Sequence, residues 1–328
     1  MKNISIAVSG ALLCSFLTTS CNNKTAQQTD TVNQTETTAS TAQTKPADCK
    51  PLETRQPSNP EQKPTFEGQT RACGIKSETA FDVMVLAKGL VNPWAVEPLP
   101  EGDLLVTEKP GRMRIVSATG ALGKPLTGLP AVDDAGQGGL LDVALSPNFG
   151  SDRTIFWSFT EPRQGGNGTS IARGVLSQDR TKLEQVKVIL RTQPTYNGDK
   201  HYGSRLTFGP DGMVYVTLGE RSDLETRPQA QHMNSHLGKI LRITPEGKPA
   251  SDNPFLNQSG TLPEIWTVGH RNVQAAAFDA NGKFWVVEMG PKGGDELNLV
   301  EKGKNYGWPL VTFGEEYSGR PVPNAVTT

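Results

Sequence analysis

The sequence has no excess of either charge and no long apolar run. It carries 33 Lys and Arg against 34 Asp and Glu, a formal net charge of −1, so the surplus of cations that neutralises nucleic-acid phosphates is missing. No apolar run reaches the roughly 20 residues that a membrane-spanning helix needs. Turn-forming residues are frequent, with 34 Gly and 24 Pro, and they disfavour a helical bundle. The composition excludes nucleic-acid-binding, all-helical and multi-pass membrane proteins.

Cysteines are also few, and the first two lie at the N-terminus. Lys2 precedes an apolar stretch over residues 4–17 and the small residues of 18–20, which is the pattern of a signal peptide over residues 1–20. Because Cys21 follows Ser20 directly, the segment resembles a bacterial lipoprotein signal, although Thr18 stands where leucine is usual. We expect export, to the periplasm or to the outer membrane through a lipid on Cys21. The alternative is a secreted protein with an ordinary Cys21.

The remaining cysteines could form a disulfide. Cys14 lies inside the signal, and if Cys21 carries a lipid, Cys49 and Cys73 are left as an even pair. An oxidising compartment would let this pair close, and the alternative is two free thiols. There is no C-x-x-C spacing, so the sequence indicates neither a zinc nor an iron–sulfur site.

Composition divides the chain into a tether and a folded domain. Residues 21–79 begin with a stretch rich in Thr, Gln, Ser and Ala and continue with a lead-in rich in Pro and Gln. Such a stretch has too little apolar surface to fold. We therefore predict a low-complexity tether over 21–79 and a folded domain over 80–328.

Within that domain a short β-unit repeats. Each copy is a strand, a tight turn with Pro, Asn, Asp or Gly, and a second apolar strand; the copies lie at 95–108, 143–159, 206–220 and 276–290. Their spacing of roughly 45 to 70 residues is typical of the four-stranded blades of a β-propeller. A β-sandwich is the alternative, but it would not repeat itself in this way. We predict an all-β propeller with about four blades in this chain.

Four stretches carry polar residues that a propeller does not need for folding. Glycines flank Gln137; His201 precedes one predicted strand, and Glu220 follows the next, so a hairpin would bring the two together as a base and its orienting acid. Arg271, Asn272 and Gln274 share a loop, which places one cation beside two amides. Each of these residues, taken alone, is more often structural.

The last stretch, residues 288–309, surrounds the carboxylates of Glu288, Asp295 and Glu296 with glycines. Carboxylates beside exposed loop carbonyls suit Ca²⁺, which takes six to eight oxygen ligands. The alternative is a solvated turn.

Taken in order, these stretches resemble the soluble PQQ-dependent sugar dehydrogenases, and in particular the bacterial aldose sugar dehydrogenases. The resemblance runs from about Phe81 to Thr328 and includes the connecting segments NPWAV, HLGKILRIT, DNPF and EIWTVGHRN. It implies a six-bladed propeller, two blades more than this chain contains. We therefore expect the sequence to be a C-terminally incomplete member.

The resemblance also implies a role for each site residue. His201 is expected to take the proton from the sugar, with Glu220 as its acidic partner, and Arg271 to lie against the quinone carbonyls. Cofactor contacts are implied for Gln137, Asn272, Gln274 and Tyr317. The carbonyls of Gly290 and Pro291 would hold the Ca²⁺ bound to the cofactor, and Glu296 and Tyr306 would hold a second Ca²⁺.

The implied reaction is oxidation of an aldose at C1 to the lactone, with hydride transfer to Ca²⁺-bound PQQ and reoxidation by an external electron acceptor. The family's last blades supply Lys and Arg for the PQQ carboxylates, so the activity of this chain alone stays open. Two alternatives remain: a Ca²⁺-dependent lactonase, and a non-catalytic envelope propeller that binds a partner or a glycan. Titration with the quinone would separate the dehydrogenase from both.

Overall fold

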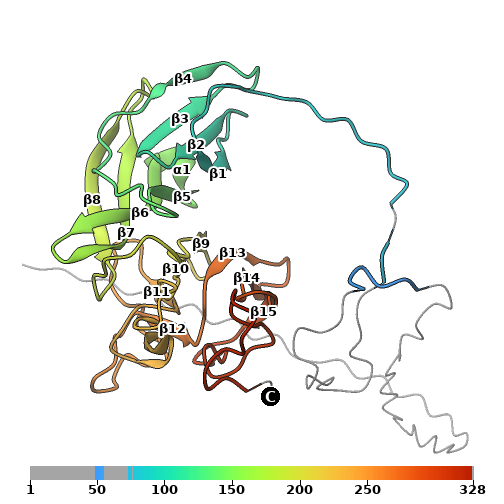
Figure 1. Cartoon of the computed structure of the whole chain (residues 1–328). Helices are drawn as coiled ribbons and strands as arrows, with labels where there is room; N and C mark the ends of the chain where they lie inside the picture. The colour runs from blue at the N-terminus through green and yellow to red at the C-terminus, as the bar shows by residue number, and fades with distance from the viewer. Residues whose placement is uncertain (1–48, 55–72, 76, 327–328) are drawn as a thin grey trace, which may run out of the picture. The chain divides into compact units, whose positions relative to one another are not determined.

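Four antiparallel sheets follow one another along the chain (Figure 1). The computed structural model describes residues 49–54, 73–75 and 77–326, which belong to one unit, Asp48–Thr328. The first sheet contains β1 (Pro93–Pro98), β2 (Leu104–Glu108), β3 (Arg112–Val116) and β4 (Leu122–Pro125). The second contains β5 (Leu140–Leu145), β6 (Thr154–Arg163), β7 (Gly166–Leu176) and β8 (Leu183–Arg191).

The third sheet contains β9 (Leu206–Phe208), β10 (Val214–Thr217), β11 (Lys239–Ile243) and β12 (Ile265–Val268). The fourth contains β13 (Val273–Phe278), β14 (Phe284–Glu288) and β15 (Glu296–Val300). Two short helices join strands, α1 (Phe149–Asp152) and the 3₁₀ helix η1 (Arg227–Gln231). In each sheet, strands that are consecutive in sequence pair as neighbours, which is the blade pattern of a propeller. The predicted fold, with four blades in this chain, is confirmed.

Tight turns form where the repeat predicted them. In the first, third and fourth blades a glycine closes the turn between the first two strands, at Gly102, Gly212 and Gly282, with φ between 74° and 91°. Each donates its N–H to the carbonyl three residues earlier, at 2.9 Å. Other residues rarely adopt this left-handed conformation, so the turn glycines fix where each strand pair begins and ends.

The fourth blade has three strands among the residues described. After β15 the chain returns to the third blade: Tyr306 N–H donates to the carbonyl of Val268 at 2.9 Å, and Val268 N–H donates to the carbonyl of Lys304 at 3.1 Å. The segment that could have been an outer strand is therefore paired with β12 instead.

Side chains from successive blades interdigitate to form the core. One buried cluster joins the first blade to the second through Leu105, Met113, Trp157 and Phe159. A second cluster joins the second blade to the third, and a third, which contains Tyr215 and Phe284, joins the third blade to the fourth. Burial between sheets, and not on a single face, is the reason why these strands are apolar on both sides.

Buried hydroxyl groups tie neighbouring blades together. Thr107 Oγ1 donates to the carbonyl of Leu141 at 2.6 Å, Ser158 Oγ to that of Ser204 at 2.7 Å, and Thr217 Oγ1 to that of Val273 at 3.0 Å. Each hydroxyl oxygen also accepts a backbone N–H from the first strand region of its own blade, at 2.9 to 3.0 Å. The same two-bond link thus recurs at all three contacts between successive blades.

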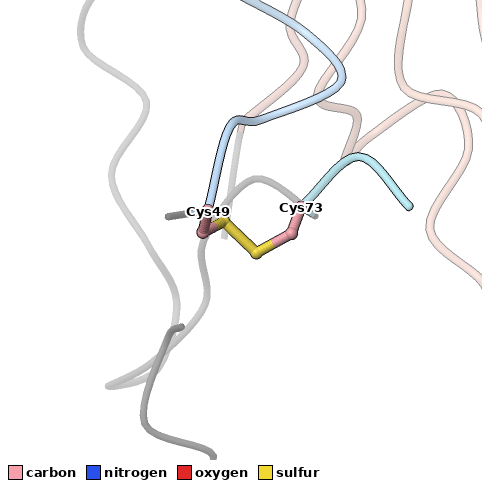
Figure 2. The surroundings of a disulfide bond; sticks show 2 residues. All are labelled: Cys49 and Cys73. Atoms are coloured by element: carbon pink, nitrogen blue, oxygen red, sulfur yellow. A yellow bond between two sulfur atoms is a disulfide. The ribbon is translucent and has the colours of Figure 1, made fainter. Parts of the chain in front are cut away.

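Cys49 and Cys73 form a disulfide (Figure 2). Their Cα atoms are 5.2 Å apart, so the structure chooses the bridge over two free thiols. The predicted signal peptide, Cys21 and most of the predicted tether lie outside the described residues. Among the described residues, no helix has the length and apolarity needed to cross a membrane.

Candidate active site

The predicted site residues gather where the blades' first strands begin and their second strands end. Gln137 precedes β5, His201 precedes β9, and Arg271 and Asn272 precede β13, whereas Glu220 follows β10. Because the first two strands of a blade are antiparallel, the start of one and the end of the other lie at the same edge. Residues far apart in sequence therefore come together at one face of the sheets.

His201 and Glu220 form a buried pair. His201 Nδ1 lies 2.8 Å from Glu220 Oε1, and the two side chains are 9% and 1% exposed. A carboxylate only accepts hydrogen bonds, so in the neutral imidazole this contact places the hydrogen on Nδ1 and the free lone pair on Nε2. The structure thus gives the arrangement that a general base needs, with the acid as the group that orients it.

Gln137 and Asn272 connect this pair to the rest of the site. Gln137 Oε1 accepts the N–H of His201 at 2.9 Å, and Asn272 Oδ1 accepts the N–H of Gly203 at 3.0 Å and Nε2 of Gln274 at 3.1 Å. In both amides the oxygen is used by the protein, so the NH₂ groups of Gln137 and Asn272 are the ends left to face a ligand. A site lined by such donors favours a ligand rich in acceptor oxygens.

Arg271 is buried between two carboxylate-bearing segments. Its Nη1 donates to the carbonyls of Met289 at 2.8 Å and Gly290 at 2.6 Å, and its backbone N–H donates to Glu288 Oε2 at 2.8 Å. Burial lowers the pKa of Arg271, and the charge of Glu220 and the neighbouring Tyr317 hydroxyl oppose that change. Its buried Nε has no hydrogen-bond partner among the described residues.

A second histidine–glutamate pair, His270 and Glu288, contacts the backbone of Arg271. His270 is fully buried; its Nδ1 lies 2.9 Å from Glu288 Oε1, and its ring stacks on Tyr306 at 4.7 Å between centroids. Glu288 therefore holds the His270 ring with one oxygen and the Arg271 backbone with the other. The sequence singled out Glu288 as a candidate metal ligand, and its oxygens are occupied by these contacts.

A cavity of about 280 Å³ adjoins these residues, although His201, Glu220 and Arg271 are not among those that line it. Its lining combines predicted residues with others that the motifs missed: Gln137, Asn272 and Gln274, together with Trp94, Lys109, Leu141, Tyr202, Gly203 and Met289. Trp94 falls in the segment NPWAV that carried part of the resemblance, which was the one available signal. Lys109 stands in no motif; its Nζ donates to the carbonyl of Gly136, which places a cation at the cavity wall.

An ion pair that the sequence did not indicate lies beside this cavity. Arg205 Nη1 is 2.5 Å from Asp142 Oδ1, and its guanidinium carbon is 5.1 Å from the centroid of the Trp94 ring. The same guanidinium reaches the carbonyl of Gln274 at 3.3 Å. Burial raises the pKa of Asp142 to about 6, although Arg205 opposes the change.

The residues predicted to bind Ca²⁺ lie on both sides of β15: Gly290 and Pro291 precede it, Glu296 begins it and Tyr306 follows it. Gly290 and Pro291 are buried, and the carbonyl of Gly290 accepts from Arg271. Glu296 Oε2 accepts from Asn298 at 3.0 Å. The Tyr306 hydroxyl already donates to the carbonyl of Leu299 and accepts from Glu301 N–H, so a cation there would need Glu296 and backbone carbonyls.

No cluster of three His, Cys, Asp or Glu side chains suited to a metal occurs within the described ranges. Burial and the neighbouring charge of Glu288 raise the pKa of Glu296. A nearby cation would favour its charged form. Tyr317, the remaining predicted cofactor contact, is 72% exposed next to Arg271.

Comparison with known proteins identifies the family of the chain. A family model described as glucose/sorbosone dehydrogenase matches residues 90–328. The chain belongs to this family. It is 41% identical to the aldose sugar dehydrogenase of Escherichia coli over 247 residues, which cover 74% of this chain and 66% of that protein.

Two solved structures show the same fold. The soluble aldose sugar dehydrogenase of Escherichia coli in its apo form matches with a TM-score of 0.72 at 41% identity, over 74% of this chain and 70% of that one. The PQQ-bound form of the aldose sugar dehydrogenase of Streptomyces coelicolor matches with a TM-score of 0.62 at 36% identity, over 73% and 68%. This glucose/sorbosone dehydrogenase family member thus spans about two thirds of the length of these relatives.

Proposed function

We propose that the whole protein oxidises an aldose sugar at C1 to the lactone, with PQQ as cofactor and Ca²⁺ as its metal. The observation that carries the proposal is the His201–Glu220 pair, 2.8 Å apart, beside a cavity lined by donor groups. The names of the relatives support it, since one is an aldose sugar dehydrogenase and another is such an enzyme in its PQQ-bound form. The pair and the cavity supply what a proton-abstracting oxidation requires.

The residues present fit an oxygen-rich anionic cofactor. Arg271 has a buried Nε without a partner among the described residues, and the amides of Gln137 and Asn272 have their NH₂ groups left for a ligand. Lys109 places a cation at the cavity wall. We assign the quinone contacts to Arg271, Asn272, Gln274 and Gln137, an outer contact to Tyr317, and Ca²⁺ ligation to the carbonyls of Gly290 and Pro291. A second Ca²⁺ would use Glu296 and the backbone near Tyr306.

The chain's own residues handle the proton. Nε2 of His201 accepts the hydrogen of the anomeric hydroxyl, which raises the electron density at C1 and promotes loss of its hydride. Glu220, through Nδ1–H, orients the ring and stabilises the imidazolium that forms. When bound, PQQ would supply a two-electron acceptor and Ca²⁺ would supply a Lewis acid. The buried cation of Arg271 would stabilise negative charge that develops on a bound cofactor.

Product analysis tests this assignment against the lactonase alternative. The PQQ- and Ca²⁺-loaded protein should reduce an artificial electron-acceptor dye in the presence of an aldose and release one lactone for each two electrons. Hydrolysis of an added lactone with Ca²⁺ alone, and no dye reduction with aldose, would instead identify a lactonase.

Export and lipidation belong to the same proposal. The Cys49–Cys73 disulfide supports location in an oxidising compartment. An external electron acceptor in that compartment would reoxidise the cofactor. We infer that Cys21 carries the anchoring lipid in the periplasm or at the outer membrane. Mass spectrometry of the mature N-terminus should find a lipidated Cys21, and Cys21→Ser should release the protein into the soluble fraction; an unmodified Cys21 would refute the anchor.

A further inference from the structure

Arg221, the residue directly after Glu220, is buried, and its side chain contacts the segment that carries His201. Its side chain is among the largest fully buried ones, and the residue is 2% exposed. Nε donates to the carbonyl of Lys200 at 3.0 Å, and Nη2 donates to the carbonyl of Gly198. Two of its hydrogen bonds therefore hold the backbone just before His201.

The same guanidinium also holds the residue after His201. Its central carbon lies 4.1 Å from the centroid of the Tyr202 ring, a cation–π distance. Nη2 donates to Asn167 Oδ1 at 2.7 Å, and the Tyr202 hydroxyl donates to that oxygen at 3.1 Å. The Arg221 side chain thus contacts both neighbours of His201: it donates a hydrogen bond to Lys200 and stacks on Tyr202.

The backbone around this contact is strained. His201 has a φ of 48°, Ser204 of 85°, Arg221 of 74° and Ser222 of 76°. These four are among nine described non-glycine residues with positive φ. Such a conformation is unfavourable for a residue with a side chain and persists only where the surroundings hold it. Arg221 belongs to one strained segment and contacts the neighbours of His201 in the other, so its side chain joins the two.

We propose that Arg221 is a positioning residue, which locks residues 198–202 so that the His201 ring points its Nδ1 at Glu220 and leaves Nε2 available. The inference rests on the proposed role of His201 as the base. Arginine suits this task because its planar fork can bond three acceptors and stack on an aromatic face together. A lysine ammonium lacks the flat face and the fork.

The test compares Arg221→Lys with Arg242→Lys. Arg242 is a matched control, since it is 6% exposed, bonds Asp211 and Asp252, and lies 5.0 Å from the Trp266 ring centroid, in contacts that include no candidate active-site residue. We expect Arg221→Lys to lower kcat by about 100-fold, the effect of a small misplacement of a reacting group, while PQQ affinity changes less than about 3-fold. Arg242→Lys should change kcat by less than about 3-fold.

A second readout needs neither cofactor nor turnover. The chain has 4 histidines, so the ¹⁵N ring signals of His201 can be assigned by their loss in His201→Ala. In the native protein they should show one tautomer with hydrogen on Nδ1; in Arg221→Lys they should average between tautomers. In Arg221→Ala, added guanidinium ion should restore the single tautomer in part.

The outcomes separate this inference from the proposed function. An unchanged His201 tautomer in Arg221→Lys, or equal losses of kcat in both arginine variants, would overturn the positioning role. If Arg221→Lys does not fold, Tyr202→Leu removes the stacked ring and should also release the tautomer; a tautomer that stays fixed overturns the role. If the native protein never binds PQQ, the proposed function fails, yet the ring signals still decide whether Arg221 positions His201.

Discussion

At the residue scale, the proposed chemistry depends on His201, which with its neighbours contacts three other parts of the site. Gln137 accepts a hydrogen bond from the His201 backbone N–H, and Glu220 accepts one from the His201 ring. Arg221 donates a hydrogen bond to the carbonyl of Lys200, the residue before His201. His201→Ala should lower kcat by about 100- to 10,000-fold, the usual contribution of a general base, with little change in PQQ affinity. Dye-linked steady-state kinetics and a PQQ titration of the variant would measure both.

The control for this prediction is another buried histidine. His236 is 3% exposed; its ring accepts the N–H of Gln193 at 3.0 Å and lies 3.4 Å from Glu264 through Nε2, and neither partner is a predicted site residue. His236→Gln should keep kcat close to that of the native protein. Loss of turnover in both variants would mean that the effect is general destabilisation and would refute the assignment of His201.

Asp142 predicts a specific pH dependence of stability. Its pKa is raised from 3.8 to about 6 by burial, so between about pH 4 and pH 6 the folded state binds a proton that the unfolded state has lost. Folding stability should therefore fall as pH rises through this window, by about 3 kcal/mol at most, and this contribution should be constant above it. Asp142→Asn should remove the fall.

Urea unfolding at pH 4, 5, 6 and 7 would measure the free energy of unfolding of both proteins. The difference between native protein and Asp142→Asn should become less favourable to the native protein up to about pH 6 and then level off. Parallel curves at all four pH values would show that Asp142 does not bind a proton more tightly in the folded state.

At the scale of the elements, a buried hydroxyl recurs at each contact between successive blades. Thr217 Oγ1 donates to the Val273 carbonyl and accepts Arg205 N–H, each at 3.0 Å. Thr217→Val keeps the side-chain shape and leaves two buried backbone groups unpaired, so we expect a loss of about 2–4 kcal/mol. Thr181→Val, at an exposed threonine, should change stability by less than about 0.5 kcal/mol.

Thermal and urea unfolding of the two variants would give these values. The reverse order, with the exposed variant more damaging, would contradict the role of the hydroxyl in joining the blades. A loss in Thr217→Val without any change in the m-value would locate the effect in the folded state.

The elements were predictable to the extent that they depend on local patterns. Turns at Gly102, Gly212 and Gly282 follow from short motifs that need a left-handed residue, and the strands around them follow from their apolar residues. The missing outer strand of the fourth blade was not predictable, because residues 304–306 pair with Val268 far away in the sequence. Pairing of that kind has no local signal.

The site shows the same division. His201 and Glu220 come together as a hairpin predicts, because each lies at a strand end. Arg205 and Asp142 are 63 positions apart, and Lys109 and Trp94 reach the cavity from another blade. Arg221 reads as an ordinary charged residue, and only its burial reveals its contacts. Two kinds of feature could not be predicted from the sequence: contacts between side chains of different blades, and the burial of the charged Arg221 side chain.

At the scale of the whole molecule, the four blades form one face at which cofactor and substrate would meet. The chain spans 62% and 66% of the length of two curated relatives that it matches. On the fourth blade Val287, Leu297 and Leu299 are 43%, 68% and 37% exposed, whereas the faces between successive blades are packed. Activity is therefore proposed for the whole protein.

Calorimetric titration of PQQ, with and without Ca²⁺, is the most direct test of the central claim. It would use the product of the complete gene, with the 328 residues alone alongside. We predict saturable, Ca²⁺-dependent binding by the complete product, reduced at least about 10-fold by Arg271→Leu, because a buried cation facing the cofactor is lost. No binding by the complete product in the presence of Ca²⁺ would contradict the account.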